Sequence, residues 1–532
     1  MNDRKKIVYK NISITFFAQI AKLILRFVLQ KIFIAQLGDA YLGYNSVFAN
    51  ILEMLNMADL GVGIAITSFL YKPLAEQNYK HINALMYLYK KIYRLIGLFV
   101  TIIGGFIALL LPVLIPDADC SNSYLQCLFL INLVGTVSTY FLAYKRTLVI
   151  AKQKSYYTNS IDLIMNLAGT MMQILFLFTL PNYIIYSIIN IAKNIISNII
   201  ISFSCDQEST ALSKEIDKEI VDEYKKPIMQ YVKNVFISKI GAYIYHGTDN
   251  IIISIFAGSL SAGYFSNYTL ITTGLYAVLN QILASIQATY GNYVALNTEK
   301  EEQFKMTNNY MFVDFMLGNL CLVCCLILFQ PFMKLYLGSK YLLGYSTVLL
   351  LCVNIFLTIM LVIPSQIFII YKLYQYDKYI ILFSAAANII ISSLLANYIG
   401  VNGVLIGTLI TSLIYLLSRV SIISNKIFSK SIGIYLKKIL LYLCISAASI
   451  CIAWLSTIGI RVVSWISLLC EGIMTGSICI LVSTILSCKM EEAKYLLFHI
   501  LPFSKKIYLL ICGAAILLIG GLQIYLRYAP LP

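Results

Sequence analysis

Two basic residues, Lys22 and Arg26, lie inside an apolar segment near the start of the chain. On a helix they share about 80° of one face with other polar residues, namely Thr15, Gln19 and Gln30. Charged groups are costly in hydrocarbon, so this face is expected to line an interior cavity. An arginine keeps its proton and can bind two phosphate oxygens at once. The stripe therefore predicts a binding site for an anionic head group.

A second polar stripe lies 220 residues further along the chain. Within about 60° of one helix face, it contains Lys239, Tyr243, His246 and Asn250. The shift superimposes Gln19 on Lys239, Arg26 on His246 and Gln30 on Asn250. His246 is either a packed, hydrogen-bonded residue or a group that changes its charge with pH.

Two other apolar segments also carry polar residues along one face. These residues are Asn45, Glu53, Asn56 and Asp59 in 41–70, and Asp162 and Asn166 in 157–179. In one interpretation, the two cations near the N-terminus only hold helices together, by pairing with Glu53, Asp59 or Asp162. We favour a substrate role, because the basic residues outnumber what a structural pair needs. Four residues are candidates for binding a coupling ion: Asp59, Asp162, Asp249 and Asp314.

The composition excludes a soluble protein. Of the 532 residues, 60% are apolar and 12% are charged, and the mean hydropathy is +0.81. A soluble domain carries about a quarter charged residues, so this chain needs lipid as its solvent. The expected external loops are short, and the sequence has no nucleophile triad, metal-ligand set or phosphate-binding loop. We expect an all-α polytopic membrane protein that is not an enzyme and uses no cofactor.

Fifteen apolar runs of about 20 residues predict transmembrane helices. They span 12–36, 41–70, 92–115, 124–150, 157–179, 183–204, 231–257, 264–296, 310–334, 346–371, 379–399, 402–424, 439–458, 464–487 and 507–527. The net charge is +16, and basic residues gather in alternate predicted loops, for example at Lys145, Arg146, Lys152 and Lys154. Because basic loops stay on the cytoplasmic side, the pattern places the N-terminus in the cytoplasm of a multi-pass plasma-membrane protein.

The first twelve helices are predicted to be two copies of a six-helix unit. Under the 220-residue shift, 33–46 and 252–266 match at four positions: Gly38 with Gly258, Gly43 with Gly263, Tyr44 with Tyr264 and Ser46 with Ser266. Duplicated bundles are typical of alternating-access transporters, whose substrate path lies between the halves. We predict two pseudo-symmetric lobes with two or three added helices: an N-lobe (1–204), a cytoplasmic linker (205–230), a C-lobe (231–424) and a C-terminal part (425–532).

Three segments carry a resemblance to a known family: LGDAYLGYNSVFANILEMLNMADLGVGIAI at 37–66, DNIIISIFAGSLSAGYFSNYTLI at 249–271 and NYIGVNGVLIGTLIT at 397–411. The chain resembles, over nearly its whole length, the polysaccharide transporter branch of the multidrug/oligosaccharidyl-lipid/polysaccharide exporter superfamily. That branch includes flippases of O-antigen, capsule and teichoic-type repeat units. The resemblance implies two lobes around a cavity, and transfer of undecaprenyl-diphosphate-linked oligosaccharide across the bacterial plasma membrane. It also implies that cavity cations meet the diphosphate or acidic sugars, at Arg26, Lys22, Lys239 and His246.

The resemblance further implies certain partners. They are the lipid-linked oligosaccharide, membrane lipids, a coupling ion (H⁺ or Na⁺), and a polysaccharide polymerase and glycosyltransferases; nucleic acid is not expected. The last apolar run, 507–527, departs from the family's usual fourteen helices. The alternative on the same scaffold is an ion-coupled multidrug or cation exporter, which needs an acidic, aromatic cavity. The cations Lys22, Arg26 and Lys239 favour an anionic substrate instead.

Overall fold

The computed structural model describes residues 21–56, 60–152, 155–208, 217–296, 299–371, 373–460, 462–496, 519 and 523. Within these ranges the chain is helical apart from short connections, and it contains no strand. Ten of the described helical segments are long and apolar enough to cross a membrane. The predicted class, an all-α polytopic membrane protein, is confirmed.

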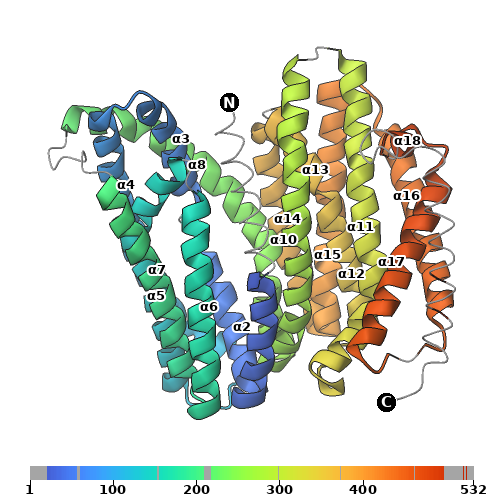
Figure 1. The fold of residues 1–532 in the computed structure, drawn as a ribbon, viewed down its shortest axis with the longest axis horizontal. Coiled ribbons are helices and arrows are strands. Elements are labelled where there is room, and N and C mark those ends of the chain that lie inside the picture. The colour runs from blue at the N-terminus through green and yellow to red at the C-terminus, as the bar shows by residue number, and fades with distance from the viewer. Residues whose placement is uncertain are drawn as a thin grey trace. The chain divides into compact units, whose positions relative to one another are not determined.

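Contacts divide the chain into two compact units, Met1–Asn267 and Tyr268–Pro532. The first unit (Figure 1) contains a helix over residues 21–37, then α2 (Asp39–Asn56), α3 (Leu60–Ala75), α4 (Tyr79–Leu114), α5 (Asn122–Ala151), α6 (Ser155–Thr179), α7 (Tyr183–Glu208), α8 (Lys218–Gly247), α9 (Asp249–Ala257) and the beginning of α10 (Ser259–Leu296). The second contains the rest of α10, α11 (Lys300–Tyr336), η1 (Ser339–Tyr341), α12 (Tyr345–Met360), α13 (Val362–Ile370), α14 (Tyr374–Ile399), α15 (Val401–Ile422), η2 (Ile423–Phe428), α16 (Ile432–Thr457), α17 (Trp465–Ser487) and α18 (Glu491–Tyr495). The predicted lobe boundaries stay a prediction.

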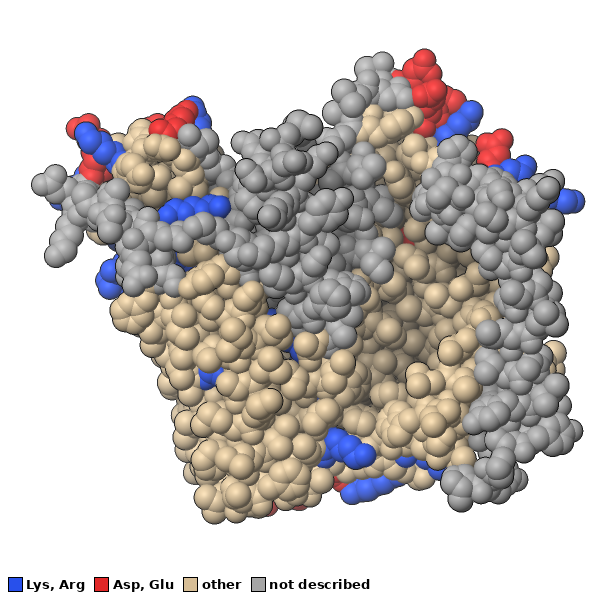
Figure 2. Space-filling model, in the orientation of Figure 1, with Lys and Arg blue, Asp and Glu red and all other residues tan. Residues whose placement is uncertain are grey.

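The outward faces of the long helices are apolar. On α4, one helical stripe leaves large side chains more than half exposed, at Leu98, Ile102, Phe106 and Leu109. Figure 2 shows that most of the Lys, Arg, Asp and Glu side chains in view lie near the upper and lower edges of each unit, with few charged side chains in between. An apolar band between charged ends matches the hydrocarbon layer and the two interfaces of a bilayer.

The two turns that the sequence comparison aligned adopt the same backbone conformation. Gly38 lies between the helix over residues 21–37 and α2, with φ of +87°, and Gly258 lies between α9 and α10, with φ of +88°. A side chain is strained at such positive φ, so glycine is required at both turns. The matched positions are therefore equivalent in the structure as well as in the sequence.

The second pair of matched glycines, Gly43 on α2 and Gly263 on α10, lies in direct contact inside the first unit. A Cβ on Gly43 would be 2.5 Å from the carbonyl oxygen of Ser259, and a Cβ on Gly263 would be 3.0 Å from the backbone nitrogen of Gly43. Small residues let two helix backbones approach this closely within a membrane. The repeated motif thus packs against its own copy.

Two of the predicted spans contain a break between helices that the sequence did not predict. The span 231–257 is divided between α8 and α9, which meet at Thr248, and 346–371 is divided between α12 and α13, which meet at Leu361. Within the second of these spans lies Pro364, which has no backbone N–H and so cannot donate a helical hydrogen bond. Hydropathy measures polarity and not backbone continuity, so it does not detect such breaks.

Two basic or mixed-charge segments extend into helices. Part of the predicted linker belongs to α8, whose start is stabilised by the Asp217 carboxylate accepting the Glu219 N–H at 3.0 Å. Lys145 and Arg146, counted above with a basic loop, lie within α5, in agreement with the predicted span 124–150. The extra predicted helix, 507–527, falls outside the described residues except at 519 and 523.

Candidate functional site

Three basic side chains come together in the first unit. Lys22 and Arg26 lie on the helix over residues 21–37, where Lys22 is half-buried and Arg26 is exposed. Their positive charges act on the ammonium group of Lys193, which is half-buried on α7. We call these three residues the cation cluster. Like charges repel one another, so such a cluster favours the binding of an anion that neutralises them.

Aromatic packing positions the cluster. The Phe33 ring lies 4.9 Å from the Tyr186 ring and 6.1 Å from the Tyr183 ring, which joins the helix over residues 21–37 to α7. Arg26 is seven residues before Phe33, and Lys193 is seven residues after Tyr186. Seven residues are about two helical turns, so each cation lies on the same face as its aromatic neighbour. The Arg26 charge also acts on the Tyr186 hydroxyl.

A glycine on α6 makes room for the stem of Lys193. A Cβ on Gly169 would lie 2.7 Å from Cδ of Lys193 and 3.0 Å from its Cβ. Lys193 was not among the predicted site residues, although a lone lysine within the apolar run 183–204 is a signal of the same kind as Lys22 and Arg26. The part that sequence could not supply is the pairing of Lys193 with the N-terminal helix.

No carboxylate pairs with the cation cluster within the described ranges. Asp162, one of the predicted partners, is bound by Arg146, whose Nη1 donates to Oδ1 at 3.1 Å while Nη2 donates to Oδ2. The Ser197 hydroxyl also donates to Asp162 Oδ1, at 2.7 Å. Glu53 is exposed. Asp162 therefore pairs with Arg146 on α5 and not with the cation cluster.

Several of the predicted polar residues connect helices of the first unit. Asn45 Oδ1 accepts from the Tyr183 hydroxyl at 3.1 Å, and Asn56 Oδ1 accepts from the Tyr140 hydroxyl at 3.0 Å. Gln30 donates to Asn267 Oδ1 at 3.0 Å. These hydrogen bonds link α2 to α7 and to α5, and the helix over residues 21–37 to α10.

The remaining predicted residues are placed as follows. Asn166 donates to the backbone carbonyl of Asp162 at 2.7 Å, the buried Oδ1 of Asn250 has no partner among the described residues, and Asp249 lies in the first turn of α9. Gln19 and Asp59 lie outside the described residues. Lys239, Tyr243 and His246 fall within α8, at positions where the structure describes the backbone only.

The second unit contains a basic residue of a different kind, Arg419 on α15. It donates to Asp377 from Nε at 2.9 Å and from Nη2 at 2.7 Å, and its guanidinium lies over the Tyr415 ring at 4.2 Å. Both partners of this ion pair are buried. Neither residue was singled out from the sequence, because the residues pair across helices and lie 42 positions apart.

The fourth predicted aspartate, Asp314 on α11, is fully buried in the second unit. Its Oδ2 accepts the Ile363 N–H at 2.9 Å, at the beginning of α13. Among the described residues, no three His, Cys, Asp or Glu side chains form a group that could hold a metal ion. The described side chains can therefore bind ions of opposite charge and repel ions of like charge.

No protein-family model matches this chain, and no curated protein matches it. Solved structures do. The lipid II flippase MurJ in an inward closed conformation has a TM-score of 0.66 at 16% identity, over 90% of this chain and 98% of that one. An inward-facing multidrug resistance MATE family transporter of the MOP superfamily has a TM-score of 0.60 at 14% identity, over 76% and 95%.

A third match is the Vibrio cholerae MATE transporter VcmN, with a TM-score of 0.56 at 12% identity, over 80% of this chain and 98% of that one. At such low identities the likeness establishes the fold alone, and these neighbours are a flippase and transporters. The chain therefore has the fold shared by the MurJ flippase and the MATE transporters of the MOP superfamily.

Proposed function

We propose that the protein is a flippase that moves undecaprenyl-diphosphate-linked oligosaccharide repeat units across the bacterial plasma membrane, for cell-surface polysaccharide synthesis. The observation that carries this proposal is the cation cluster of Lys22, Arg26 and Lys193, which lacks a carboxylate partner in the described part of the chain. A diphosphate supplies the negative charge that such a cluster needs. An exporter of cationic drugs needs the opposite charge in its cavity.

The mechanism requires no bond to be made or broken. A diphosphate and hydrated sugars cannot enter hydrocarbon, where each charge costs several kcal/mol. The cluster offers the diphosphate three cations in place of water, while the polyprenyl tail stays in lipid. Alternating access then moves the head group from the cytoplasmic to the outer side. In this proposal Lys239 and His246, at the matching positions of α8, extend the cationic path.

The wider setting of the function is also part of the proposal. The N-terminus lies in the cytoplasm, the lobes 1–204 and 231–424 rock about the substrate, and an ion gradient resets them. Glycosyltransferases supply the repeat units, and a polymerase consumes them. Asp59, Asp162 and Asp249 stay predictions as coupling residues; Asp162 already holds Arg146 in this conformation.

The test uses purified full-length protein in vesicles that contain a fluorescent lipid-linked oligosaccharide. The fraction accessible to a membrane-impermeant quencher reports transfer between leaflets. We expect transfer with the unchanged protein, and a loss of about tenfold or more with Arg26→Ala or Lys193→Ala, since each removes a charge-assisted contact of about 1.5 to 3 kcal/mol.

The matched control is Lys31→Ala. Lys31 is exposed on the same helix, about 140° around its axis from Arg26. Transfer that falls equally in Lys31→Ala and Arg26→Ala would remove the specific role of the cluster. No transfer by the unchanged protein, together with efflux of a cationic dye, would favour the drug exporter instead.

A further inference from the structure

The helix break between α12 and α13 lies inside a membrane span. α12 ends at Met360, Leu361 connects the two helices, and α13 begins at Val362. Pro364 has no N–H, so it leaves the carbonyl of Met360, four residues earlier, without the usual helical donor. Inside a membrane, such breaks are tolerated where protein groups or water satisfy the backbone.

Asp314 reaches this break from α11. Its Oδ2 accepts the Ile363 N–H at 2.9 Å, and this bond satisfies one of the donors exposed at the beginning of α13. Its Oδ1 is buried and has no hydrogen-bond partner among the described residues. A buried carboxylate is poorly stabilised as an anion when one oxygen accepts a single hydrogen bond from a neutral donor and the other oxygen accepts none.

Arg419 does not pair with Asp314. Arg419 acts, like Asp314, on the Tyr276 hydroxyl, so the three groups lie in one region. Yet Arg419 donates twice to Asp377, and its Nη1 donates to the Ser365 hydroxyl. These donors are therefore used by Asp377 and Ser365, and Asp314 forms no ion pair within the described ranges.

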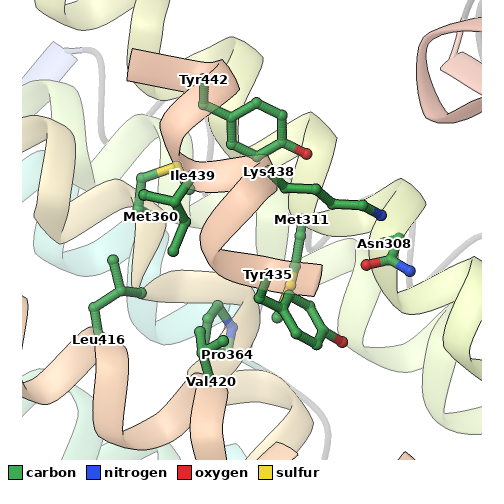
Figure 3. Close-up of a pocket in the computed structure, with 10 residues that line it drawn as sticks. All are labelled: Asn308, Met311, Met360, Pro364, Leu416, Val420, Tyr435, Lys438, Ile439 and Tyr442. Carbon is green, nitrogen blue, oxygen red and sulfur yellow. The ribbon is translucent and has the colours of Figure 1, made fainter. Parts of the chain in front are cut away.

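A pocket connects the break with the polar end of α16. Met360 and Pro364, on either side of the break, line it, and so does Met311, one turn before Asp314. At its other side lie Lys438, the Asn308 amide and the Tyr435 hydroxyl (Figure 3). The pocket leaves about 30 Å³ for a water-sized molecule, which is enough for one or two waters.

Two residues that line the pocket carry a buried polar atom without a hydrogen-bond partner in the described part of the chain. Asn308 Oδ1 and the Tyr435 hydroxyl have none among the described residues. Buried polar atoms that the protein leaves unsatisfied are the usual holders of internal water. Water at these atoms would lie between the charged Lys438–Glu492 pair and the residues around the helix break.

We propose that Asp314 is a proton-binding site of the second unit, and that water in this pocket, which Met311 lines one turn away on α11, supplies its protons. A proton from solution, relayed by water in the pocket, forms an O–H bond at Oδ1, so that the carboxylate becomes a neutral carboxylic acid and the relaying water stays neutral. Oδ2 then accepts the Ile363 N–H as a neutral group, and such bonds are weaker than those to a carboxylate. Proton binding thus loosens the contact of α11 with the break.

Other ionisable groups on the helices around α11 set the conditions of this site. In the described part of the chain they are Tyr276 on α10, Asp377 on α14, Arg419 on α15, Tyr435, Lys438 and Tyr442 on α16, Glu471 on α17 and Glu492 on α18. Asp377 and Glu492 are held by cations, at Arg419 and Lys438. Use of the Asp314 proton to drive transport rests on the proposed function; the binding of the proton does not.

The experiment is infrared difference spectroscopy of the full-length protein in lipid, with the pH stepped in H₂O and in D₂O. We expect a carboxylic-acid C=O band that shifts in D₂O and is absent from Asp314→Asn, which keeps the shape of the side chain and an acceptor for Ile363. The matched control is Glu301→Gln, an exposed carboxylate on the same helix, which should keep the band.

A second variant tests the route. Tyr435→Phe removes a water-binding hydroxyl while filling the same space, and we expect the band to form about fivefold more slowly after a pH jump. A carboxylic-acid band that is unchanged in Asp314→Asn would overturn the proposal. Stabilisation of the unchanged protein against thermal unfolding by Na⁺, if Asp314→Asn abolishes it, would also overturn the proposal, because the site would then bind Na⁺. If the unchanged protein shows the carboxylic-acid band but does not transfer lipid, only the proposed function is contradicted.

Discussion

The cation cluster of the first unit and Arg419 of the second unit place the same kind of charge in opposite settings. Arg419 is buried, bidentate to Asp377 and covered by the Tyr415 ring. Arg26 is exposed, and its charge meets two further cations and no carboxylate within the described residues. A cation whose charge is already balanced holds a fold together. One that lacks a counter-ion is available to a ligand.

The largest expected effect comes from removing half of the balanced pair. Asp377→Ala leaves the Arg419 guanidinium buried without its anion, which should cost about 3 to 5 kcal/mol of stability. The measurement is the thermal unfolding temperature of the protein in detergent. A temperature within a degree or two of the unchanged protein would show that Arg419 is not structurally dependent on Asp377, and the comparison would fail on that side.

Introducing a partner into the cation cluster should have the next largest effect. Lys193→Glu places a carboxylate beside Arg26 and Lys22 and so converts the cluster into an internally balanced group. We expect lipid transfer to fall about 100-fold, with the protein still folded, since two charge-assisted contacts to the diphosphate are lost or reversed. Lys193→Arg, which keeps the charge, should retain most transfer. Equal activity of the two variants would contradict the account.

A smaller effect is expected from the glycine that seats Lys193. Gly169→Ala places a methyl group against Cβ and Cδ of Lys193 and should displace the ammonium group. We expect transfer to fall about fivefold and stability to fall by about 1 kcal/mol, as for modest overpacking. The control is Gly105→Ala on α4, where an added Cβ meets no atom within 4 Å. Transfer reduced equally by both changes would mean that Lys193 is not positioned by Gly169.

The smallest effect is expected at an exposed ion pair. Lys430 Nζ lies 2.8 Å from Glu301 Oε2, and both side chains are substantially exposed. Lys430→Ala should therefore change stability by at most about 1 kcal/mol and leave transfer unchanged. Thermal unfolding of this variant beside Asp377→Ala measures how far burial, rather than pairing alone, determines the cost.

The sequence predicted the features that depend on composition and local pattern. Hydropathy is a property of the segment, so the all-α membrane fold could be inferred. The match of Gly38 with Gly258 could be seen because positive φ demands glycine at both turns. The contact of Gly43 with Gly263 is shown by the structure alone, because a repeat in sequence does not say that its two copies touch.

The parts that sequence could not predict depend on side chains that meet across helices. Nothing in the spacing shows that Arg146 takes Asp162, or that Arg419 takes Asp377. Lys193 shares no helix with Lys22 and Arg26, so a helical-wheel argument leaves it out. The break at Leu361 was hidden for a related reason, since the carboxylate that caps it comes from α11.

The most direct test of the central claim is head-group selectivity. Purified protein in lipid nanodiscs is titrated with undecaprenyl diphosphate and with uncharged undecaprenol, for the unchanged protein, for Arg26→Ala with Lys193→Ala, and for Lys31→Ala. We predict that the unchanged protein and Lys31→Ala bind the diphosphate at least tenfold more tightly than the alcohol, about 1.4 kcal/mol, and that the double variant loses this preference. A preference retained in full by the double variant would contradict the account.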